Sequence, residues 1–406
     1  MTQLDNYDYL QAREMALQAA VPTHRRETVM LDRALGRVIA QEILCRKNMP
    51  SFDNSAMDGF AVLAADAGNR VEVIGTIFAG EVPPDRALQP GQAWRIMTGA
   101  QVPPSVEAVV PIENCTDVRD ASVVLPPSVK PGANIRLRGE EQQKGNRLFG
   151  VGTRLSAAHI AMLSAQGIVA VEVYAPLSIA VVSTGDEIRE PWEASSEDEI
   201  YNANAFGITA WLRAHGFEAT YVGSIPDDLD ATIALIADLR AYDVILSTGG
   251  ISMGDADYLY AAYVANGMEP IFHGVNVKPG RPVMMGRMGE TFVMGMPGNP
   301  LTTLVNLHLL SLPVLAKLQG ASPWHHPVIH IPNATPFRVR PGRTNLVLGA
   351  VREGRFHVTR DNRYGSGMLT PLIESNAIAV LDETHDGAKE GELLPIVMIG
   401  DSIKIG

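Results

Sequence analysis

The spacing of hydrophobic residues changes along the chain, and each change predicts a different kind of structure. Two short amphipathic helices are expected before residue 40, from the spacing of Leu10, Leu17 and Val21 and then of Leu31, Leu35 and Val38. From about residue 50 to 137, short β-prone runs alternate with Pro/Gly turns, which is typical of a β-rich domain. Residues 153–167 return to a helical pattern that ends at Gly167.

Residues 177–320 alternate regularly between two patterns. Buried-strand patterns fall at residues 177–183, 219–224, 243–247 and 291–295, and helical patterns follow them at residues 204–216, 228–240, 257–267 and 299–310. This alternation predicts a mostly parallel α/β sheet. A Pro-rich stretch at 322–337 reads as a linker, and the remainder predicts a small domain of short strands.

Composition narrows the class of protein. Hydrophobic residues make up 46% of the 406 residues and mean hydropathy is +0.05, so several packed cores are expected. The net charge of −12, without any Lys/Arg-rich run, argues against a partner such as nucleic acid or an anionic membrane. The two cysteines supply neither a disulfide framework nor a zinc site. With no visible export signal or membrane span, a cytoplasmic location is expected.

Polar loops follow the predicted parallel strands, and they should gather along one edge of the sheet. These loops are residues 183–187, 224–228, 247–257 and 295–300. Glycines such as Gly249 and Gly250 let backbone N–H groups approach phosphate oxygens closely. A helix that begins at Asn299 and Pro300 adds unpaired N–H groups and a positive dipole end. The edge is therefore expected to bind an anion.

Carboxylates at the same edge point to a cation beside that anion. Glu187, Asp227 and Asp257 would repel an anionic ligand unless a divalent ion lay among them, and Mg²⁺ binds carboxylates together with phosphate oxygens. Lys278 and Arg281 lie on a Pro/Gly loop that could aim two cations at an oxyanion. The alternatives are helix capping for Asp257 and for one of Asp227 and Asp228, and solvated surface charge for Lys278 and Arg281.

One short motif suggests a different enzyme class. Residues 250–254, GISMG, match the G-x-S-x-G nucleophile elbow, so a serine hydrolase acting through Ser252 is a rival hypothesis. An elbow leads directly into a helix, whereas here an acidic segment intervenes and opposes oxyanion formation. The P-loop, GxGxxG and HExxH motifs do not occur, so P-loop NTPases, dinucleotide-binding folds and zincins have no motif support.

An ordered set of motifs carries a resemblance that runs almost the length of the chain. The motifs are FDNSAMDGFAV, RIMTGA, NIRLRGE, VVSTGDEI, STGGISMGDADY, VKPGRP and GMPGNP. This set resembles the MoeA-type molybdopterin molybdenumtransferases, the family that includes the E domain of gephyrin. The resemblance implies four domains: an elongated helical domain (22–45 and 138–170), a β-rich domain (46–137), an α/β molybdopterin-binding domain (1–21 and 171–325) and a C-terminal β-barrel (326–406).

The resemblance also implies an activity, which is Mg²⁺-dependent cleavage of adenylylated molybdopterin with insertion of molybdate and release of AMP. By motif, the catalytic residues would be Asp58, Glu187, Asp227, Asp257 and Lys278, with Glu187, Asp227 and Asp257 as candidate metal ligands and Asp257 the best of them. Substrate would be bound by Thr98, Gly249, Gly250, Ser252, Arg281, Asn299, Thr302, Arg343 and Ser366.

Family members form homodimers whose active site draws on both subunits, so Asp58 is expected to serve the partner's site. Three features depart from the usual pattern: Glu141 follows Gly139-Glu140 where GED is common, Gly274 stands where many relatives have a basic residue, and the C-terminal motif around Ser366 is the loosest match. A non-catalytic molybdopterin-binding scaffold with this fold is the alternative function, and preference for tungstate over molybdate stays open.

Overall fold

The computed structural model describes residues 5–225, 228–251 and 258–399, and the chain divides into two compact units. Unit 1 is residues 1–40, 151–156 and 171–406, and unit 2 is residues 41–150 and 157–170. The predicted site residues Asp227, Ser252 and Asp257 lie outside the described residues. The division into four domains stays a prediction.

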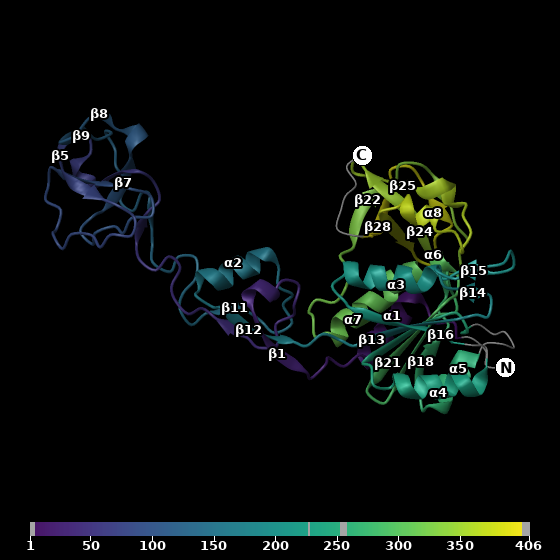
Figure 1. The fold of residues 1–406 in the computed structure, drawn as a ribbon. Helices are drawn as coiled ribbons and strands as arrows, with labels where there is room; N and C mark the ends of the chain where they lie inside the picture. The colour runs from purple at the N-terminus through teal and green to yellow at the C-terminus, as the bar shows by residue number, and fades with distance from the viewer. Residues whose placement is uncertain (1–4, 226–227, 252–257, 400–406) are drawn as a thin grey trace. The chain divides into compact units, whose positions relative to one another are not determined.

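A six-stranded mixed sheet forms the centre of unit 1 (Figure 1). Its order is β16 (Ala219–Ile225), β13 (Ile179–Thr184), β17 (Val244–Thr248), β21 (Thr291–Met296), β20 (Met284–Met288) and β18 (Glu269–His273). The first four strands are parallel, as predicted, whereas β20 and β18 add in the antiparallel sense. The sequence analysis missed both of these strands. Strand β20, with the sequence MMGRM, is methionine-rich and lacks both alternation and β-branched residues.

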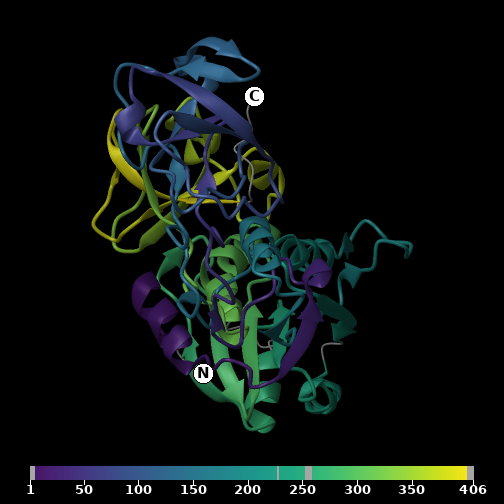
Figure 2. The same cartoon turned by 90° about the vertical axis from the view of Figure 1, so that its left-hand side faces the viewer.

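Helices cover both faces of this sheet. One face packs against α1 (Tyr9–Ala19), α3 (Ala203–Ala214), α6 (Pro300–Asn306) and α7 (Leu312–Leu318), and the other against α4 (Leu229–Leu239) and α5 (Tyr258–Ala265). Figure 2 shows α1, in purple, beside the sheet strands of unit 1. Among the described residues, only the run Pro300–Leu318 is long and apolar enough to cross a membrane, and 83% of it is buried inside the protein.

Several helices of unit 1 begin at a residue whose side chain caps the first turn, and some end at a glycine. Asp228 caps α4 by accepting the amide N–H of Ala231 at 2.8 Å, so the capping alternative is right for Asp228. Asn202 caps α3 in the same way through Ala205. The chain leaves α3 and α5 through Gly216 and Gly267, both in the left-handed region.

The second predicted N-terminal helix is wrong. Residues Arg26–Met30 form strand β1, which pairs with β12 (Ala170–Tyr174), and only a short 3₁₀ turn, Leu31–Arg33, follows. Tertiary pairing decides the conformation here, because β1 pairs with β12 and Val38 of the predicted helix instead forms an antiparallel bridge to Arg154. Leu35, which belonged to the supposed apolar face, is 64% exposed.

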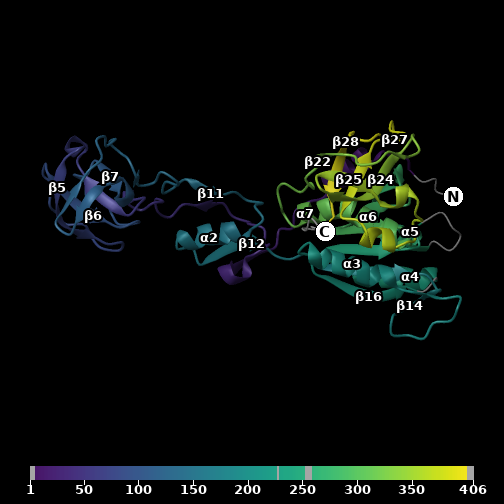
Figure 3. The same ribbon diagram turned by 90° about the horizontal axis from the view of Figure 1, so that it is seen from above.

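A second sheet occupies the C-terminal part of unit 1. Its path runs β19 (Val277–Lys278), β24 (Thr344–Arg352), β26 (Ala377–Leu381), β28 (Leu393–Met398) and β22 (Ile329–Pro332), with β25 (Arg355–Val358) beside β24. In Figure 3 its strands lie over α6 and α7, and Leu346, Leu348 and Ile378 share the core of those helices. A single bridge, Asn333 to Phe356, links the end of β22 to β25, and the closed barrel stays a prediction.

Short elements complete unit 1. They are β14 (Ile188–Arg189) paired with β15 (Ile200–Tyr201), β23 (Phe337–Arg338) paired with β27 (Gly387–Ala388), and α8 (Thr370–Ile373).

Unit 2 is built mainly of β-strands, in agreement with the strand patterns expected between residues 50 and 137. Its main sheet has the order β7 (Ala108–Pro111), β4 (Gly59–Val62), β6 (Gln92–Ile96), β5 (Arg70–Ile77), β9 (Ser122–Val124) and β8 (Thr116–Arg119). Both faces are covered, because Phe60 and Val62 enter one core and Ala61 the other. The remaining elements are β2 (Ile43–Leu44) with β11 (Arg147–Phe149), β3 (Asn54–Ser55) with β10 (Ile135–Arg136), and α2 (Ala157–Ala165).

Three histidines form a cluster where the helical run meets the C-terminal sheet. The His308 ring stacks on His326 with centroids 4.2 Å apart, and His215 lies 5.4 Å away. His308 Nε2 donates to the carbonyl of Met398 at 2.9 Å, while its Nδ1 is buried without a partner. Burial is the main cause that lowers the pKa of His308 from 6.5 to about 3, and the nearby His326 and His215 lower it further. His308 is therefore neutral in the folded protein.

This cluster predicts loss of stability in weak acid. Below pH 6.5 His308 binds a proton in the unfolded state, whereas in the folded state it stays neutral until the pH approaches 3. The free energy of unfolding that neutral His308 contributes is therefore fully present above pH 6.5 and is lost as the pH falls towards 3. We expect about 2 kcal/mol of the unfolding free energy to be lost at pH 5 through this residue. His308→Gln keeps an N–H donor without titrating, so urea denaturation from pH 7 to 5 should give a flatter profile. His357→Gln, at an exposed position, is the control, and parallel profiles for all three proteins would contradict the assignment.

Candidate functional site

A polar cleft opens at the edge of the sheet where the parallel strands end. It has a volume of about 690 Å³ and is lined by the loops after β13 and β17 and by the loop before α6. The predicted residues Glu187, Gly249, Gly250 and Asn299 all line it. The sequence-based expectation that these loops meet at one edge is confirmed for the described residues, because β13, β17 and β21 are parallel neighbours.

Two glycines shape the floor of the cleft. Gly249 and Gly250 have φ values of 84° and 60°, and a Cβ at either position would lie 2.8 Å from Thr184 Oγ1. Any other residue would be strained and would collide with the end of β13. The glycine pair therefore lets the end of β17 pass closely by β13 and leaves backbone exposed to a ligand.

Glu187 lines the same cleft. A Cβ at Gly185 would lie 2.8 Å from Glu187 Oε2 and 3.0 Å from Oε1, so this carboxylate folds back over the Gly185 backbone. Its residue is exposed, and no ion pair with another described residue neutralises it. An exposed carboxylate in this cleft is a chemically suitable ligand for a hard cation.

The segment of residues 185–201, here named the arm, carries Glu187 and is held by a network of side-chain hydrogen bonds. Tyr221 on β16 donates to Glu190, and Asn202 donates to Tyr221 at 2.9 Å and to Ser183 at 2.9 Å. Burial and the Glu190 carboxylate raise the pKa of Tyr221 to about 12, so it stays a donor at neutral pH. These hydrogen bonds join Glu190, within the arm, and Asn202, just after it, to strands β13 and β16 of the sheet.

Asn204 is a site residue that the sequence analysis missed. Its Nδ2 donates to Thr248 Oγ1 at 2.8 Å and to the carbonyl of Gly298 at 2.7 Å, and its Oδ1 is buried without a partner. Asn204 thereby ties the loop after β17 to the loop before α6. One asparagine at the start of a helix carries no signal that could have identified this role from sequence.

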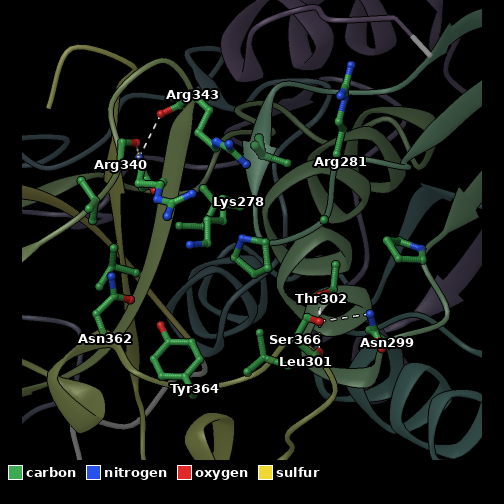
Figure 4. A pocket seen from close by; sticks show the side chains of 18 of the residues that line it. Lys278, Arg281, Asn299, Leu301, Thr302, Arg340, Arg343, Asn362, Tyr364 and Ser366 are labelled. Carbon is green, nitrogen blue, oxygen red and sulfur yellow. Dashed lines mark hydrogen bonds between the residues drawn. The ribbon is translucent and has the colours of Figure 1, made fainter. Parts of the chain in front are cut away.

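A second, strongly cationic pocket of about 570 Å³ adjoins the cleft through Asn299, which lines both. The predicted residues Lys278, Arg281 and Arg343 line it, as do Arg338 and Arg340, and no described carboxylate does. Figure 4 shows Lys278, Arg340 and Arg343 gathered on one side, whereas Arg281 extends away from that group. The pocket is suited to an oxyanion with more than one negative charge.

Backbone pairing brings the two cationic loops together. Strand β19 places Val277 and Lys278 opposite Thr344 and Asn345 of β24 in parallel register. Asn345 Nδ2 then donates to the carbonyls of Arg340 at 2.9 Å and Arg343 at 3.0 Å, which fixes the Arg-rich turn. The sequence analysis missed Arg338 and Arg340, although three arginines in the hexapeptide RVRPGR were an available signal.

The loop around Ser366 lies at the junction of the two spaces. Asn299 Nδ2 donates to Ser366 Oγ at 3.1 Å, and Thr302 donates to the carbonyl of Ser366 through both its amide and its Oγ1 at 3.4 Å (Figure 4). Thr302 is buried, so it positions the loop from below. One of the first N–H groups of the helix that starts at Pro300 therefore donates to Ser366. The sequence analysis had expected this N–H group to be free for a ligand.

Asp58 and Thr98 belong to unit 2 and contact each other there. Asp58 Oδ1 accepts the Thr98 amide N–H at 2.7 Å and its hydroxyl at 2.8 Å. These hydrogen bonds lower the pKa of the exposed Asp58 carboxyl below its usual value. Asp58 is thus a fixed, ionised carboxylate, and the two predicted residues form one feature.

Comparison with known proteins gives matches to three consecutive parts of the chain. Family profiles match residues 8–167 as "MoeA N-terminal region (domain I and II)", 180–317 as "Probable molybdopterin binding domain" and 330–399 as "MoeA C-terminal region (domain IV)". Together they span both the cleft and the cationic pocket.

Curated and solved relatives cover nearly the whole chain. A protein of Haemophilus influenzae named molybdopterin molybdenumtransferase is 32% identical over 95% of this chain and 97% of its own length. One of the same name from Bacillus subtilis is 31% identical over 92% of this chain and 90% of its own length. The crystal structure of a molybdopterin biosynthesis moeA protein from Pyrococcus horikoshii is 27% identical, with a TM-score of 0.82 over 97% of this chain and 100% of that one. The chain therefore belongs to the MoeA family.

Proposed function

We propose that this chain is a molybdopterin molybdenumtransferase, which takes adenylylated molybdopterin and molybdate and releases AMP during molybdenum cofactor biosynthesis. The observation that carries the proposal is the pairing of two spaces, a cationic pocket and a polar glycine-floored cleft, that meet at Asn299 and the Ser366 loop. One space suits a small oxyanion and the other suits a phosphate-bearing ligand.

The cationic pocket would hold molybdate. Lys278, Arg340 and Arg343 surround space that no described carboxylate lines, so a dianion there gains attraction from several charges. The planar guanidinium fork of arginine donates two parallel hydrogen bonds to two oxygen atoms of an oxyanion, and Ser366 adds a hydroxyl at the rim. These residues would hold the oxyanion beside the cleft and orient it towards the second substrate.

The cleft would hold the phosphate groups of adenylylated molybdopterin. Gly249 and Gly250 expose backbone at its floor, and Asn204 keeps the two phosphate-facing loops at a fixed separation. This arrangement positions the bond to be broken without rearrangement at the moment of reaction.

Mg²⁺ is part of the proposal, and the donor chemistry of the cleft fits it. Within the described residues no group of three or more His, Cys, Asp or Glu side chains could hold a metal by itself. Mg²⁺ commonly uses only one or two protein carboxylates and fills its other positions with phosphate oxygens and water. Glu187 would be one such ligand, and Asp227 and Asp257 are the candidates from sequence. Bound there, the ion would neutralise charge on the phosphate oxygens.

Three further features belong to the proposal. Asp58, held ionised by Thr98, would be a catalytic carboxylate in a homodimer with a shared active site. The protein would act in the cytoplasm. Sedimentation of the purified chain tests the dimer directly.

The decisive experiment is AMP release from adenylylated molybdopterin by the purified protein with molybdate and Mg²⁺. We expect turnover by the wild type and a loss of about 10²-fold in kcat for Glu187→Gln, because the carboxylate that would hold Mg²⁺ beside the reacting phosphates is removed. Glu197→Gln, on the same arm and also exposed, is the matched control.

Two outcomes would contradict the proposal in different ways. Tight binding of the substrate without AMP release would favour the non-catalytic scaffold. Full activity of Glu187→Gln would remove Glu187 from the site, while leaving the transferase activity itself in place.

A further inference from the structure

A strained turn lies at the edge of the cationic pocket. Arg360, Asp361 and Asn362 have φ values of 49°, 50° and 59°, and none of them is glycine. This left-handed conformation is unfavourable for residues with a side chain, and three in succession are rare. Such a turn persists only where neighbouring groups hold it.

Two contacts hold this turn from opposite sides. On the outside, Arg360 forms a two-pronged ion pair with Glu374, with Nε to Oε2 at 2.8 Å and Nη2 to Oε1 at 2.6 Å. On the inside, Asn362 Nδ2 donates to the carbonyl of Arg338 at 3.2 Å. Glu374 is the C-terminal cap residue of α8, so the ion pair ties the turn to a short helix.

The chain leaving the turn leads directly to the junction of the two spaces. Tyr364 accepts the amide N–H of Leu348 at 2.8 Å, and two residues later Ser366 contacts Asn299 and Thr302. Asn362, Tyr364 and Ser366 all line the cationic pocket. The path of the turn therefore decides where these three residues stand relative to Lys278 and Arg343.

We infer that Arg360 and Glu374 are positioning residues for the oxyanion pocket, which they influence without lining it. Their ion pair holds the left-handed turn, and the turn places Asn362 and Ser366 at the anion. When the pair is broken, the turn relaxes towards right-handed conformations and Ser366 moves from the pocket rim. The inference rests on the proposed binding of molybdate in this pocket.

Calorimetric titration of the purified full chain with molybdate tests the inference. We expect Glu374→Gln and Arg360→Ala each to weaken molybdate binding by roughly fivefold, because each releases the strained turn. Arg360→Gly also breaks the ion pair, but glycine tolerates the left-handed conformation, so it should bind molybdate more tightly than Arg360→Ala. A role of Arg360 through its charge alone would give equal losses for the alanine and glycine variants.

Matched controls separate this effect from general destabilisation. Arg355 and Glu390 form another exposed pair in the C-terminal part of unit 1, at 3.9 Å, and Glu390→Gln should bind molybdate like the wild type. Wild-type affinity in both Glu374→Gln and Arg360→Ala, or equal losses in the Arg360→Ala and Arg360→Gly variants, would overturn the inference and leave the proposed function intact. A wild-type chain that does not bind molybdate would overturn both.

Discussion

Alanine at both Lys278 and Arg343 should lower kcat/KM for molybdate by about 10³-fold, and each single replacement by about 10²-fold. The two side chains come from separate loops that β19 and β24 bring into register, and both face the same side of the pocket. Because they would contact one dianion together, their effects are not expected to add fully. The loss should fall mainly on the molybdate dependence of the reaction.

The measurement is AMP release at varied molybdate with adenylylated molybdopterin held at saturation. Arg213→Ala removes an exposed arginine at the end of α3 whose partner is Glu218, and it should leave both constants unchanged. If the double variant kept the molybdate KM of the wild type, the oxyanion would have to bind elsewhere. A changed KM for adenylylated molybdopterin alone would instead assign these cations to its phosphates.

Sequence patterns were sufficient to predict the part of the site that is set by the parallel direction of neighbouring strands. Alternating strands and helices force parallel neighbours, and parallel neighbours place the loops with Glu187, Gly249 and Asn299 at one edge. Local chemistry also predicted that one of Asp227 and Asp228 caps a helix, and the structure shows Asp228 in that role. Both inferences start from patterns that can be read within a single strand, helix or turn.

The rest of the site depends on pairings between distant segments. Lys278 meets Arg343 only because β19 pairs with β24, and a two-residue strand has no detectable pattern. The spacing of Leu31, Leu35 and Val38 indicates a helix, but pairing of the preceding strand β1 with β12 and the bridge from Val38 to Arg154 override it. Asn204 and the turn at Arg360 likewise gain their roles from partners 44 and 14 residues away.

Gly280→Ala should be the most destabilising single-methyl change near the site, at about 3 kcal/mol of unfolding free energy. Gly280 has a φ of 104°, which a residue with a side chain rarely adopts. A Cβ there would also lie 2.1 Å from Asn306 Nδ2 and 2.5 Å from Thr302 Cγ2. Both neighbours are buried on α6, so they have little room to move.

The same change should weaken molybdate binding, because Thr302 supports the Ser366 loop and Asn306 donates to the carbonyl of Thr302 at 2.8 Å. Urea denaturation and molybdate titration of one preparation would measure both effects. Gly354→Ala is the control for backbone strain alone, since its φ is 72° and no atom lies within 4 Å of its Cβ position, so about 1 kcal/mol is expected. Equal losses of stability in the two variants would mean that helix α6 yields to the added methyl group, and the close packing of the VKPGRP loop on α6 would then not be what fixes the pocket.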